Sequence, residues 1–491
     1  ALPIFPSTKI SGTILRGWND IHTLLMECFK SRKVLAVELY AGVREDEVIN
    51  ELKSLSPTLL INTRDLMKPE NEIKEMTERF MTKDVLFGYV TNLSLKDYFD
   101  AGKLEVARKQ VAANDRVIVV GSGAAMIAQA EATLVYVDMA RWEIQQRFRA
   151  HEVKALGVDN REDAVSLQYK RGYFNDWRVL DRYKEGLFDK ADFWLDTHIA
   201  NDPRMIDRET FFKGIEETIK TPFRVVPFFD PAPWGGQWMK EVCGLNPEKE
   251  NYGWCFDCVP EENSLYFEVN GVRFELPSVD LVLLKSRELL GEPVEARFGK
   301  DFPIRFDFLD TVGGGNLSVQ VHPTTQFIRE NFGMYYTQDE SYYLLDAKDL
   351  FLKILEKEPS SKMYMQGLAG VYQYMDMKSE YEVLMKIITD GASYTSFPSR
   401  LLAYNEALKK TEGVAQQQES APVPVEPAML VIHVDSFIDG NNNKVIDAGE
   451  SFAVQFSVEN KGQGDAYNIR LRLSEQQGYD EYFDGPRELD G

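Results

Sequence analysis

Short, uninterrupted apolar segments recur through the first part of the chain and restrict its possible folds more than any other pattern. Segments with helical spacing of apolar residues separate them. Strands that are apolar along their whole length are buried on both faces, as in parallel sheets covered by helices. The sequence therefore predicts a doubly wound parallel sheet within residues 1–221. The predicted strands are Val34–Leu39, Thr58–Thr63, Val85–Val90, Val117–Val120 and Thr133–Asp138, with helices over Glu45–Leu55 and Glu70–Met81.

One kind of domain built on such a sheet is the nucleotide kinase. The segment Val137–Arg141, with Arg147 and Arg149 after it, resembles the late strand and arginine-bearing lid of small P-loop kinases. The turn after Val34–Leu39 lacks the GxxxxGK[ST] pattern whose backbone N–H groups and lysine hold phosphate. We therefore expect a kinase-like α/β domain over residues 1–221 that has no phosphate loop and transfers no phosphoryl group.

A dinucleotide-binding domain is the alternative for the same residues. Gly121-Ser122-Gly123 closes a predicted strand, and Asp138 ends the next one. Met126 stands where the fingerprint requires a third glycine or an alanine. The sequence therefore favours the kinase-like interpretation over a dinucleotide site.

Composition restricts the partners of the chain. At 491 residues it has room for several domains, and its net charge of −22 disfavours nucleic acid and anionic membranes as partners. Its four cysteines do not make a disulfide framework, and its start, Ala1-Leu2-Pro3, has no apolar signal core. These features favour a cytoplasmic location. Both ends look cut, so we expect a fragment.

A possible metal site lies in the middle of the chain. In Asn316–Pro323 apolar and polar residues alternate, which predicts a strand with Gln320 and His322 on one face. Glu340 begins another β-prone segment. Amide, imidazole and carboxylate groups together bind divalent metals, although each of these residues is also common as an ordinary polar side chain.

These residues also carry a resemblance to a known family. The segments LSVQVHP and DESYYLLDA, with Asp230–Gly236 and Phe302–Asp310 upstream, resemble the type I mannose-6-phosphate isomerases, which are zinc enzymes of the cupin class. The resemblance covers residues 222–347 and implies a partial cupin β-barrel. It implies zinc binding by Gln320, His322 and Glu340, and contact of Ser318 with a sugar phosphate. The implied reaction interconverts mannose 6-phosphate and fructose 6-phosphate.

Two departures from the family weaken the expected activity. Asp307 stands where the family usually has a lysine, and the fourth histidine ligand and catalytic arginine have no counterpart after Ala347. The catalytic base is not identifiable. The alternative is therefore a non-catalytic remnant of a cupin. We expect weak zinc binding and little or no isomerisation.

The segment between the sheet and the motifs contains a predicted hairpin. Leu265–Val269 and Val272–Leu276 alternate, and Asn270-Gly271 between them is a strong hairpin signal. A short helix is predicted over Asp280–Leu290. Cys255 and Cys258 lack a second ligand pair, so we expect ordinary reduced cysteines rather than a zinc knuckle.

The chain changes character after Ala347. Residues 348–410 show helical spacing of apolar residues, whereas a cupin would continue with strands. Either a helical domain is inserted or unrelated parts are joined, and we favour a join. Residues 411–428, rich in glutamine and proline, are predicted to form a linker.

Residues 429–491 are predicted to form a truncated, partial β-sandwich. The turn at Asn460–Ala466 resembles those of immunoglobulin-like or CARDB-type domains. A second possible metal site lies here, because oxygen ligands occupy the spacing of a calcium loop, although a solvated turn is the alternative. The candidate ligands are Asp439, Asn441, Asn443, Val445 through its carbonyl, Asp447 and Glu450.

Overall fold

The computed structural model describes residues 5–128, 131–318, 320–341 and 347–415 and the four strands β14 to β17 nearer the C-terminus. The chain divides into two compact units, Ala1–Glu340 and Ser341–Gly491. The first unit is mixed α/β, and helices and short strands make up the described part of the second. No described helix combines the length and apolarity needed to cross a bilayer.

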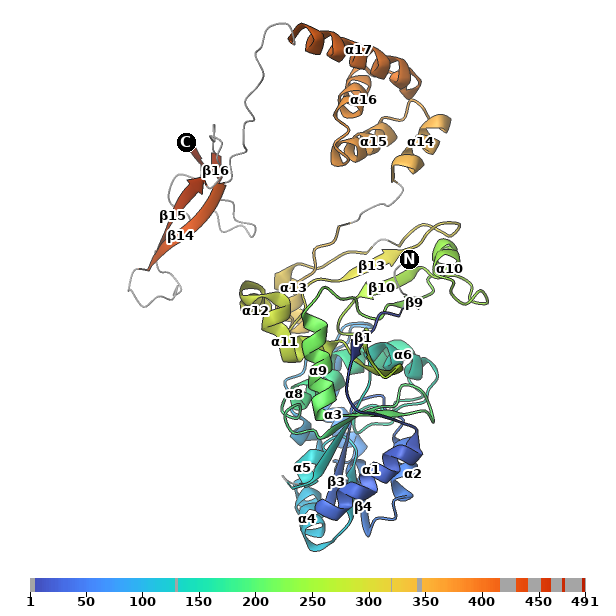
Figure 1. Ribbon diagram of the computed structural model, residues 1–491, viewed down its shortest axis with the longest axis vertical. Coiled ribbons are helices and arrows are strands. Elements are labelled where there is room, and N and C mark those ends of the chain that lie inside the picture. Colours follow the sequence, from blue (N-terminus) through green and yellow to red (C-terminus); the bar gives the residue numbers. More distant parts are fainter. Residues whose placement is uncertain are drawn as a thin grey trace. The chain divides into compact units, whose positions relative to one another are not determined.

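A seven-stranded sheet is the centre of the first unit (Figure 1). Its order is β2-β8-β7-β6-β3-β5-β4, and the five strands from β7 to β4 are parallel. Numbered along the chain, these five lie in the order second, third, first, fourth, fifth, which differs from the 3-2-1-4-5-6 order of dinucleotide-binding folds. The strands are β2 (Ile14–Arg16), β3 (Val34–Leu39), β4 (Leu59–Asn62), β5 (Val117–Val120), β6 (Thr133–Asp138), β7 (Phe193–Asp196) and β8 (Arg204–Asp207).

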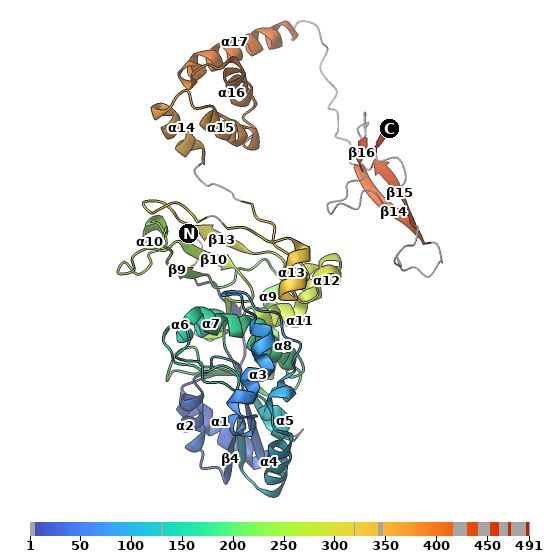
Figure 2. The same ribbon diagram turned by 180° about the vertical axis from the view of Figure 1, so that it is seen from behind.

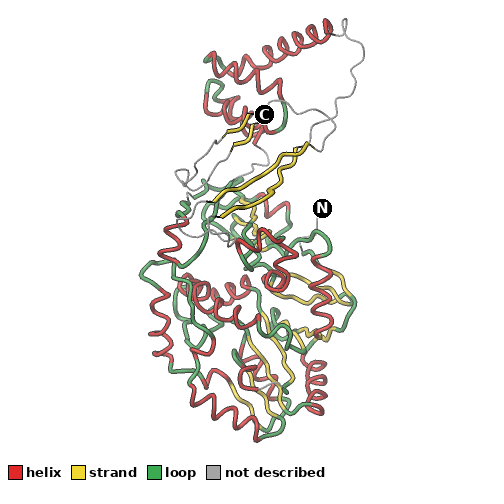
Figure 3. The backbone as a smooth tube through the Cα atoms, turned by 90° about the vertical axis from the view of Figure 1, so that its left-hand side faces the viewer, coloured by secondary structure: helices red, strands yellow, loops and turns green. Residues whose placement is uncertain are grey.

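Helices cover both faces of this sheet, as the apolar strands require. Figures 1 and 2 show α1 and α2 on one side of it and α4 and α5 on the other. In Figure 3 the strands of the sheet likewise lie between helices. The helices are α1 (Trp18–Ser31), α2 (Glu45–Lys53), α3 (Glu70–Met81), α4 (Ala101–Ala113), α5 (Ala124–Ala128), α6 (Arg141–Arg149), α7 (Val165–Arg171), α8 (Trp177–Glu185) and α9 (Arg208–Ile219), with shorter turns η1 (Thr63–Leu66), η2 (Leu95–Tyr98) and η3 (Gly172–Asp176).

The prediction of a strand at Val85–Val90 is wrong, because this segment is a loop. The Asp84 carboxylate accepts hydrogen bonds from the backbone N–H groups of Leu86, at 2.8 Å, and Phe87, at 2.7 Å. Such local bonds compete with a sheet ladder for the backbone. The Phe87 ring stacks on Phe332 with centroids 4.8 Å apart, so its apolar character serves a side-chain contact instead.

The predicted hairpin is confirmed as β11 (Ser264–Val269) and β12 (Val272–Pro277), with Asn270 and Gly271 both at positive φ. Strand β1 (Thr8–Ile10) adds to it in parallel. The buried Phe267 lies in the same core as Phe211 of α9. Gly214 permits this approach, since a Cβ there would overlap the Phe267 ring. Residues 1–221 and the hairpin therefore share one core.

A second, three-stranded sheet follows in the order β13-β10-β9. Its strands are β9 (Phe228–Asp230), β10 (Trp254–Cys258) and β13 (Phe306–Leu309). The helices of this part of the chain are α10 (Trp238–Val242), α11 (Val279–Leu290), α12 (Glu292–Phe298) and α13 (Thr325–Phe332). Among the described residues no sheet closes into a barrel. The antiparallel character expected for residues 222–347 is present, in an open form.

The strand expected at Asn316–Pro323 is also wrong for its described residues, which are irregular. Val321 is 88% exposed, so the expected burial of an apolar face is absent there. The preceding glycine turn is held by the loop that contains Trp234, because the Gly315 N–H donates to the Trp234 carbonyl oxygen at 3.0 Å. No described strand pairs with the segment, and an unpaired alternating segment has no ladder to fix it.

The second unit begins with four helices that enclose Leu368, Leu384 and Ile387. Because the last of them extends to Ala415, the expected linker start at residue 411 is wrong. The helices are α14 (Ala347–Lys357), α15 (Lys362–Tyr374), α16 (Lys378–Asp390) and α17 (Phe397–Ala415), with the turn η4 (Tyr394–Ser396). Two antiparallel pairs follow, β14 (Leu430–Asp439) with β15 (Phe452–Asn460), and β16 (Arg470–Arg472) with β17 (Glu488–Asp490).

Candidate functional sites

The turn after β3, where a kinase has its phosphate loop, is filled by an arginine. Arg147 from α6 donates to the carbonyl oxygens of Gly42 at 2.7 Å and Thr197 at 2.9 Å. Its side chain is only 1% exposed. A phosphate loop directs N–H groups at its ligand, whereas this turn directs a carbonyl at an internal cation. The turn therefore has no cradle for phosphate.

The Gly121–Gly123 turn is likewise occupied from within. Glu38, on β3, is buried, and its two carboxylate oxygens accept hydrogen bonds from Gly123 N at 2.5 Å and Ala125 N at 2.9 Å. Burial raises the pKa of Glu38 to about 8, and these backbone donors oppose that rise. In dinucleotide-binding folds such N–H groups receive the pyrophosphate. An internal carboxylate takes that place here.

A buried lysine connects the carboxyl end of strand β6, in the main sheet, to α11. Lys184 Nζ lies 2.8 Å from Asp138 Oδ2, at the end of β6, and 2.8 Å from Asp280 Oδ1 on α11. It also lies 4.4 Å from the centroid of the Tyr40 ring. Burial, followed by the charge of Asp138, raises the pKa of Asp280 well above its usual range. Ligands of open α/β sheets bind at the carboxyl ends of the strands, and here internal charges occupy that position.

A buried histidine lies at the same end of the main sheet, after strand β7. His198 Nε2 accepts a hydrogen bond from Ala140 N at 3.0 Å, and Nδ1 lies 2.7 Å from Asp196 Oδ1. Because a backbone N–H only donates, Nε2 carries no hydrogen, and Nδ1–H donates to Asp196. Asp196 Oδ2 accepts from the Glu275 N–H at 2.9 Å, which fastens β12 to the sheet. The imidazole is thus fixed in one tautomer.

The structure brings two of the predicted zinc ligands together. His322 Nε2 and Glu340 Oε2 are 2.5 Å apart, and each side chain is 30% exposed. The Thr337 hydroxyl donates to the Pro323 carbonyl oxygen at 2.6 Å, which links the two ends of the segment between them. Burial, and then the negative charge of Glu340, raises the pKa of Asp307 on β13. A second carboxylate is therefore electrostatically close to the pair.

The other two predicted residues are not part of this contact. Gln320 and Ser318 are exposed, and neither has a hydrogen bond within the described part of the chain. That part holds no group of three or more His, Cys, Asp or Glu residues arranged for a metal ion. A metal held by His322 and Glu340 would therefore need Gln320 or water to complete its coordination.

The cysteines of the CxxC segment lie on β10 and are free. Burial raises the pKa of Cys255 to about 12 and also raises the pKa of Cys258. Cys255 packs beside Met239 and Tyr252 in a small apolar cluster. A thiol kept protonated in an apolar cluster contributes packing, since only the thiolate is nucleophilic or binds metals.

The predicted calcium loop falls mostly outside the described residues. Asp439 is the last residue of β14 and pairs with Phe452, the first residue of β15. The remaining candidates lie outside the described residues, namely Asn441, Asn443, Val445, Asp447 and Glu450.

The sequence analysis missed the buried charged residues at the carboxyl ends of the main-sheet strands. Lys184 and Asp280 are 96 positions apart and have no motif around them. The one available signal was Asp280, a charged residue among the apolar neighbours of its helical segment, because such residues are almost never fully buried unless paired. Glu38, a carboxylate within an otherwise apolar strand, gave the same signal.

Comparison with known proteins gives one match. Residues 17–220 match a family described as "Domain of unknown function (DUF8485)", which is less than half of the 491-residue chain. The matched range runs from the residue before α1 to the residue after α9, so it contains six of the seven strands of the main sheet and leaves out β2. No curated protein and no solved structure matches the chain.

Proposed function

We propose that residues 222–340 form a divalent-metal module of the mannose-6-phosphate isomerase type. In this proposal His322 and Glu340 bind zinc with Gln320, and Ser318 contacts a sugar phosphate. The observation that supports it is the 2.5 Å contact between His322 and Glu340, which are 18 positions apart. Their pairing brings together the two residues that the family resemblance assigns to one metal.

Zinc binding would require a small rearrangement of this pair. Zn–N and Zn–O bonds of about 2.0–2.2 Å at tetrahedral angles separate two ligand atoms by roughly 3.4 Å. His322 Nε2 and Glu340 Oε2 lie 2.5 Å apart, so they would move apart by about 1 Å on binding. Both side chains are partly exposed, which allows this rotation. The cost of separating a solvent-exposed pair is small, about 0–1 kcal/mol.

The proposed activity is aldose–ketose isomerisation, reduced or lost. A bound divalent metal polarises substrate oxygens and stabilises the charge that develops as a proton moves. A preorganised donor at such a charge contributes about 2.7–4 kcal/mol. Asp307 places a carboxyl near Glu340 where the family has a lysine, which opposes a developing negative charge. We therefore propose weak zinc binding and poor turnover of mannose 6-phosphate.

Zinc titration of the full chain by calorimetry tests the metal site. His322→Ala, Glu340→Gln and Gln320→Ala should each weaken zinc binding about tenfold or more, because each removes a ligand. Asp339→Asn and His151→Ala are matched controls, since they change an exposed carboxylate and an exposed imidazole outside the proposed set. Equal zinc affinity in His322→Ala and the unaltered chain would refute the site.

A coupled assay with added zinc tests the activity separately. Little or no conversion of mannose 6-phosphate is expected from the unaltered chain. Robust turnover that disappears in His322→Ala would show that Asp307 and the missing ligands do not prevent catalysis. That result would keep the metal site and overturn the proposed loss of activity.

The main sheet, in the same proposal, is a kinase-like domain that supports this module without binding nucleotide. Arg147 and Glu38 fill the two turns at which a kinase or a dinucleotide-binding protein holds phosphate. The net charge of −22 disfavours nucleic acid and anionic membranes as partners, and the proposed location is cytoplasmic. Titration of the full chain with Mg–ATP should give no saturable binding, and tight binding would contradict this assignment.

A calcium-stabilised module in residues 429–491 is the second candidate. The pairing of Asp439 with Phe452 brings the two ends of the candidate loop together, as a twelve-position calcium loop requires. Calcium should therefore raise the melting temperature of the full chain, and Asp447→Asn should reduce that shift. An unchanged melting temperature at millimolar calcium would refute the calcium site.

A further inference from the structure

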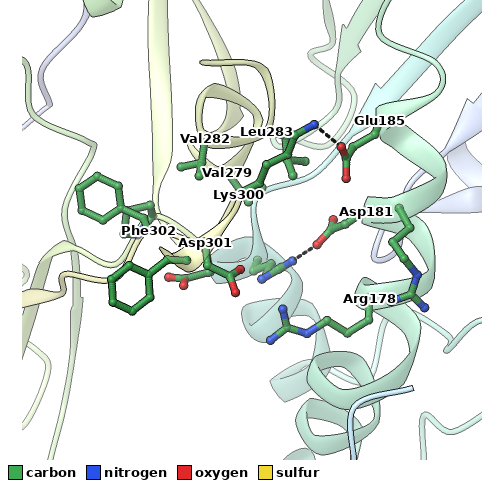
Figure 4. A pocket seen from close by; sticks show the side chains of 14 residues that line it. Arg178, Asp181, Glu185, Val279, Val282, Leu283, Lys300, Asp301 and Phe302 are labelled. Atoms are coloured by element: carbon green, nitrogen blue, oxygen red, sulfur yellow. Dashed lines mark hydrogen bonds and ion pairs between the residues drawn. The ribbon is translucent and has the colours of Figure 1, made fainter. Parts of the chain in front are cut away.

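A cavity of about 200 Å³ lies beside α8 in the first unit (Figure 4). Residues of α8 form one wall, and α11 with the segment after α12 forms the other. The cavity is distinct from the candidate metal site, since neither His322 nor Glu340 lines it. It is smaller than the roughly 300–1,000 Å³ pockets that hold drug-sized ligands, so its size suits a small metabolite.

Most charged side chains of the wall are already paired within the protein. The pairs are Arg141 with Asp181, Lys300 with Glu185, and Glu261 with Arg305, which lies outside the wall. Figure 4 shows the first two as dashed lines. Paired charges of this kind neither attract nor repel a ligand strongly, so the selectivity of the cavity depends on the charges that remain.

The remaining positive charge lies on α8. Arg178 Nε donates to the Tyr173 carbonyl oxygen at 3.1 Å, and its guanidinium lies 4.6 Å from the centroid of the Tyr173 ring. Its two terminal nitrogens have no hydrogen-bond partner within the described part of the chain. Burial, and then the positive charge of Arg178, lowers the pKa of Arg182 one turn later. This wall therefore carries uncompensated positive charge.

The remaining negative charge lies on the opposite side. Asp301 follows α12, lines the cavity, and has no hydrogen bond or ion pair with any described residue. Figure 4 shows its carboxylate on the side of the cavity away from α8. Val279, Val282 and Leu283 of α11 add an apolar surface to the cavity.

From these walls we infer that the cavity binds a zwitterionic α-amino acid with an apolar side chain. The ligand carboxylate would accept hydrogen bonds from the terminal nitrogens of Arg178, because guanidinium and carboxylate form strong two-point contacts. Its ammonium group would face Asp301, and its side chain would lie against Val282 and Leu283. A phosphate dianion fits poorly, since Asp301 would repel it.

Calorimetric titration of the full chain with L-leucine and L-phenylalanine tests the ligand class. At least one of them should bind saturably. L-leucinamide, which lacks the carboxylate, and N-acetyl-L-leucine, which lacks the ammonium group, should bind about tenfold more weakly or worse, because each loses a charge-assisted contact. No saturable binding of either amino acid at millimolar concentration, or tighter binding of inorganic phosphate, would overturn the inference.

Two variants locate the contacts. Asp301→Asn should weaken L-leucine binding without changing that of N-acetyl-L-leucine, and Arg178→Gln should weaken L-leucine binding without changing that of L-leucinamide. Asp189→Asn is the matched control, because Asp189 is exposed after the end of α8 and does not line the cavity. Melting temperatures close to that of the unaltered chain establish that the variants are folded. Folded variants with unaltered leucine affinity would place the amino acid elsewhere and overturn the assignment.

Discussion

Lys184 and His322 each contact carboxylates, but they differ in their access to solvent. Lys184 is 1% exposed between Asp138 and Asp280, and every group of that cluster lies in the interior. His322 and Glu340 are each 30% exposed at an irregular segment. A buried charge must keep its partners because water does not replace them, whereas an exposed pair exchanges its partner for water or a ligand at little cost.

This difference in solvent access distinguishes polar residues that stabilise the fold from polar residues that a ligand can reach. The Gly121–Gly123 turn of the main sheet resembles a dinucleotide-binding turn in sequence, yet the internal carboxylate of Glu38 accepts hydrogen bonds from the N–H groups of Gly123 and Ala125. The His322–Glu340 pair and the walls of the α8 cavity keep groups that a ligand can reach. Resemblance of a segment to a motif is therefore not enough for binding, because the accessibility of its polar atoms decides what it binds.

Removal of the buried ammonium group should have the largest effect. Lys184→Met leaves Asp138 and Asp280 without a counter-charge in the interior, so the free energy of unfolding should fall by about 3–5 kcal/mol. Denaturant unfolding monitored by tryptophan fluorescence measures this, since Trp177 and Trp194 are buried in the same core. Lys190→Met, at an exposed position, should change stability by about 0.5 kcal/mol or less.

A second substitution sharpens this prediction. Lys184→Met combined with Asp280→Asn should be less destabilised than Lys184→Met alone, because it removes one of the two unpaired carboxylates. Additive losses in the double variant would show that the lysine and the aspartate act independently, contrary to their 2.8 Å contact.

The intermediate effect concerns Glu38 and depends on pH. Burial raises its pKa in the folded state to about 8, above the value of about 4.3 in an unfolded chain. Between these values the folded protein retains a proton that the unfolded chain releases. Stability from this group therefore falls as pH rises, by up to about 1.4 kcal/mol per pH unit, and is greatest at the acidic end of the range.

Glu38→Gln tests this dependence. The amide NH₂ cannot accept a hydrogen bond from Gly123 or Ala125, so at pH 5 the variant should be less stable by about 1–3 kcal/mol. The difference should shrink towards pH 8, because the variant carries no titrating carboxyl. Glu78→Gln, on the exposed face of α3, should follow the unaltered chain at every pH. Parallel pH profiles for Glu38→Gln and the unaltered chain would contradict the prediction.

Local patterns predicted the elements that depend on local chemistry. Helix α3 has the predicted bounds, and the hairpin forms around Asn270-Gly271, because turn and helix signals are contained in adjacent residues. Val85–Val90 failed because an apolar run does not show whether a partner strand exists, and here Asp84 satisfies the backbone instead. Strand alternation at Asn316–Pro323 failed for the same lack of a partner.

The site residues, like the secondary structure, were predicted only in part. The resemblance named His322 and Glu340, and the structure pairs them, whereas Gln320 and Ser318 remain exposed and apart from that pair. The buried charges at the carboxyl ends of the main-sheet strands were not predictable, since Lys184 on α8 and Asp280 on α11 come from distant segments of the chain. Contacts between distant segments depend on the whole fold, and no local pattern encodes them.

The smallest effect on stability is expected for the exposed pair of His322 and Glu340. A substitution there should instead change zinc binding. His322→Ala removes a contact between two side chains that are each 30% exposed, so the free energy of unfolding should change by about 1 kcal/mol or less. In the presence of zinc the unaltered chain should gain melting temperature, because a ligand that binds only the folded state stabilises it. His322→Ala should lose that gain, and Lys184→Met should keep it if the metal site is independent of the buried cluster. A large loss of stability in zinc-free His322→Ala would mean that the histidine serves the fold, and the contrast between the two regions would no longer hold.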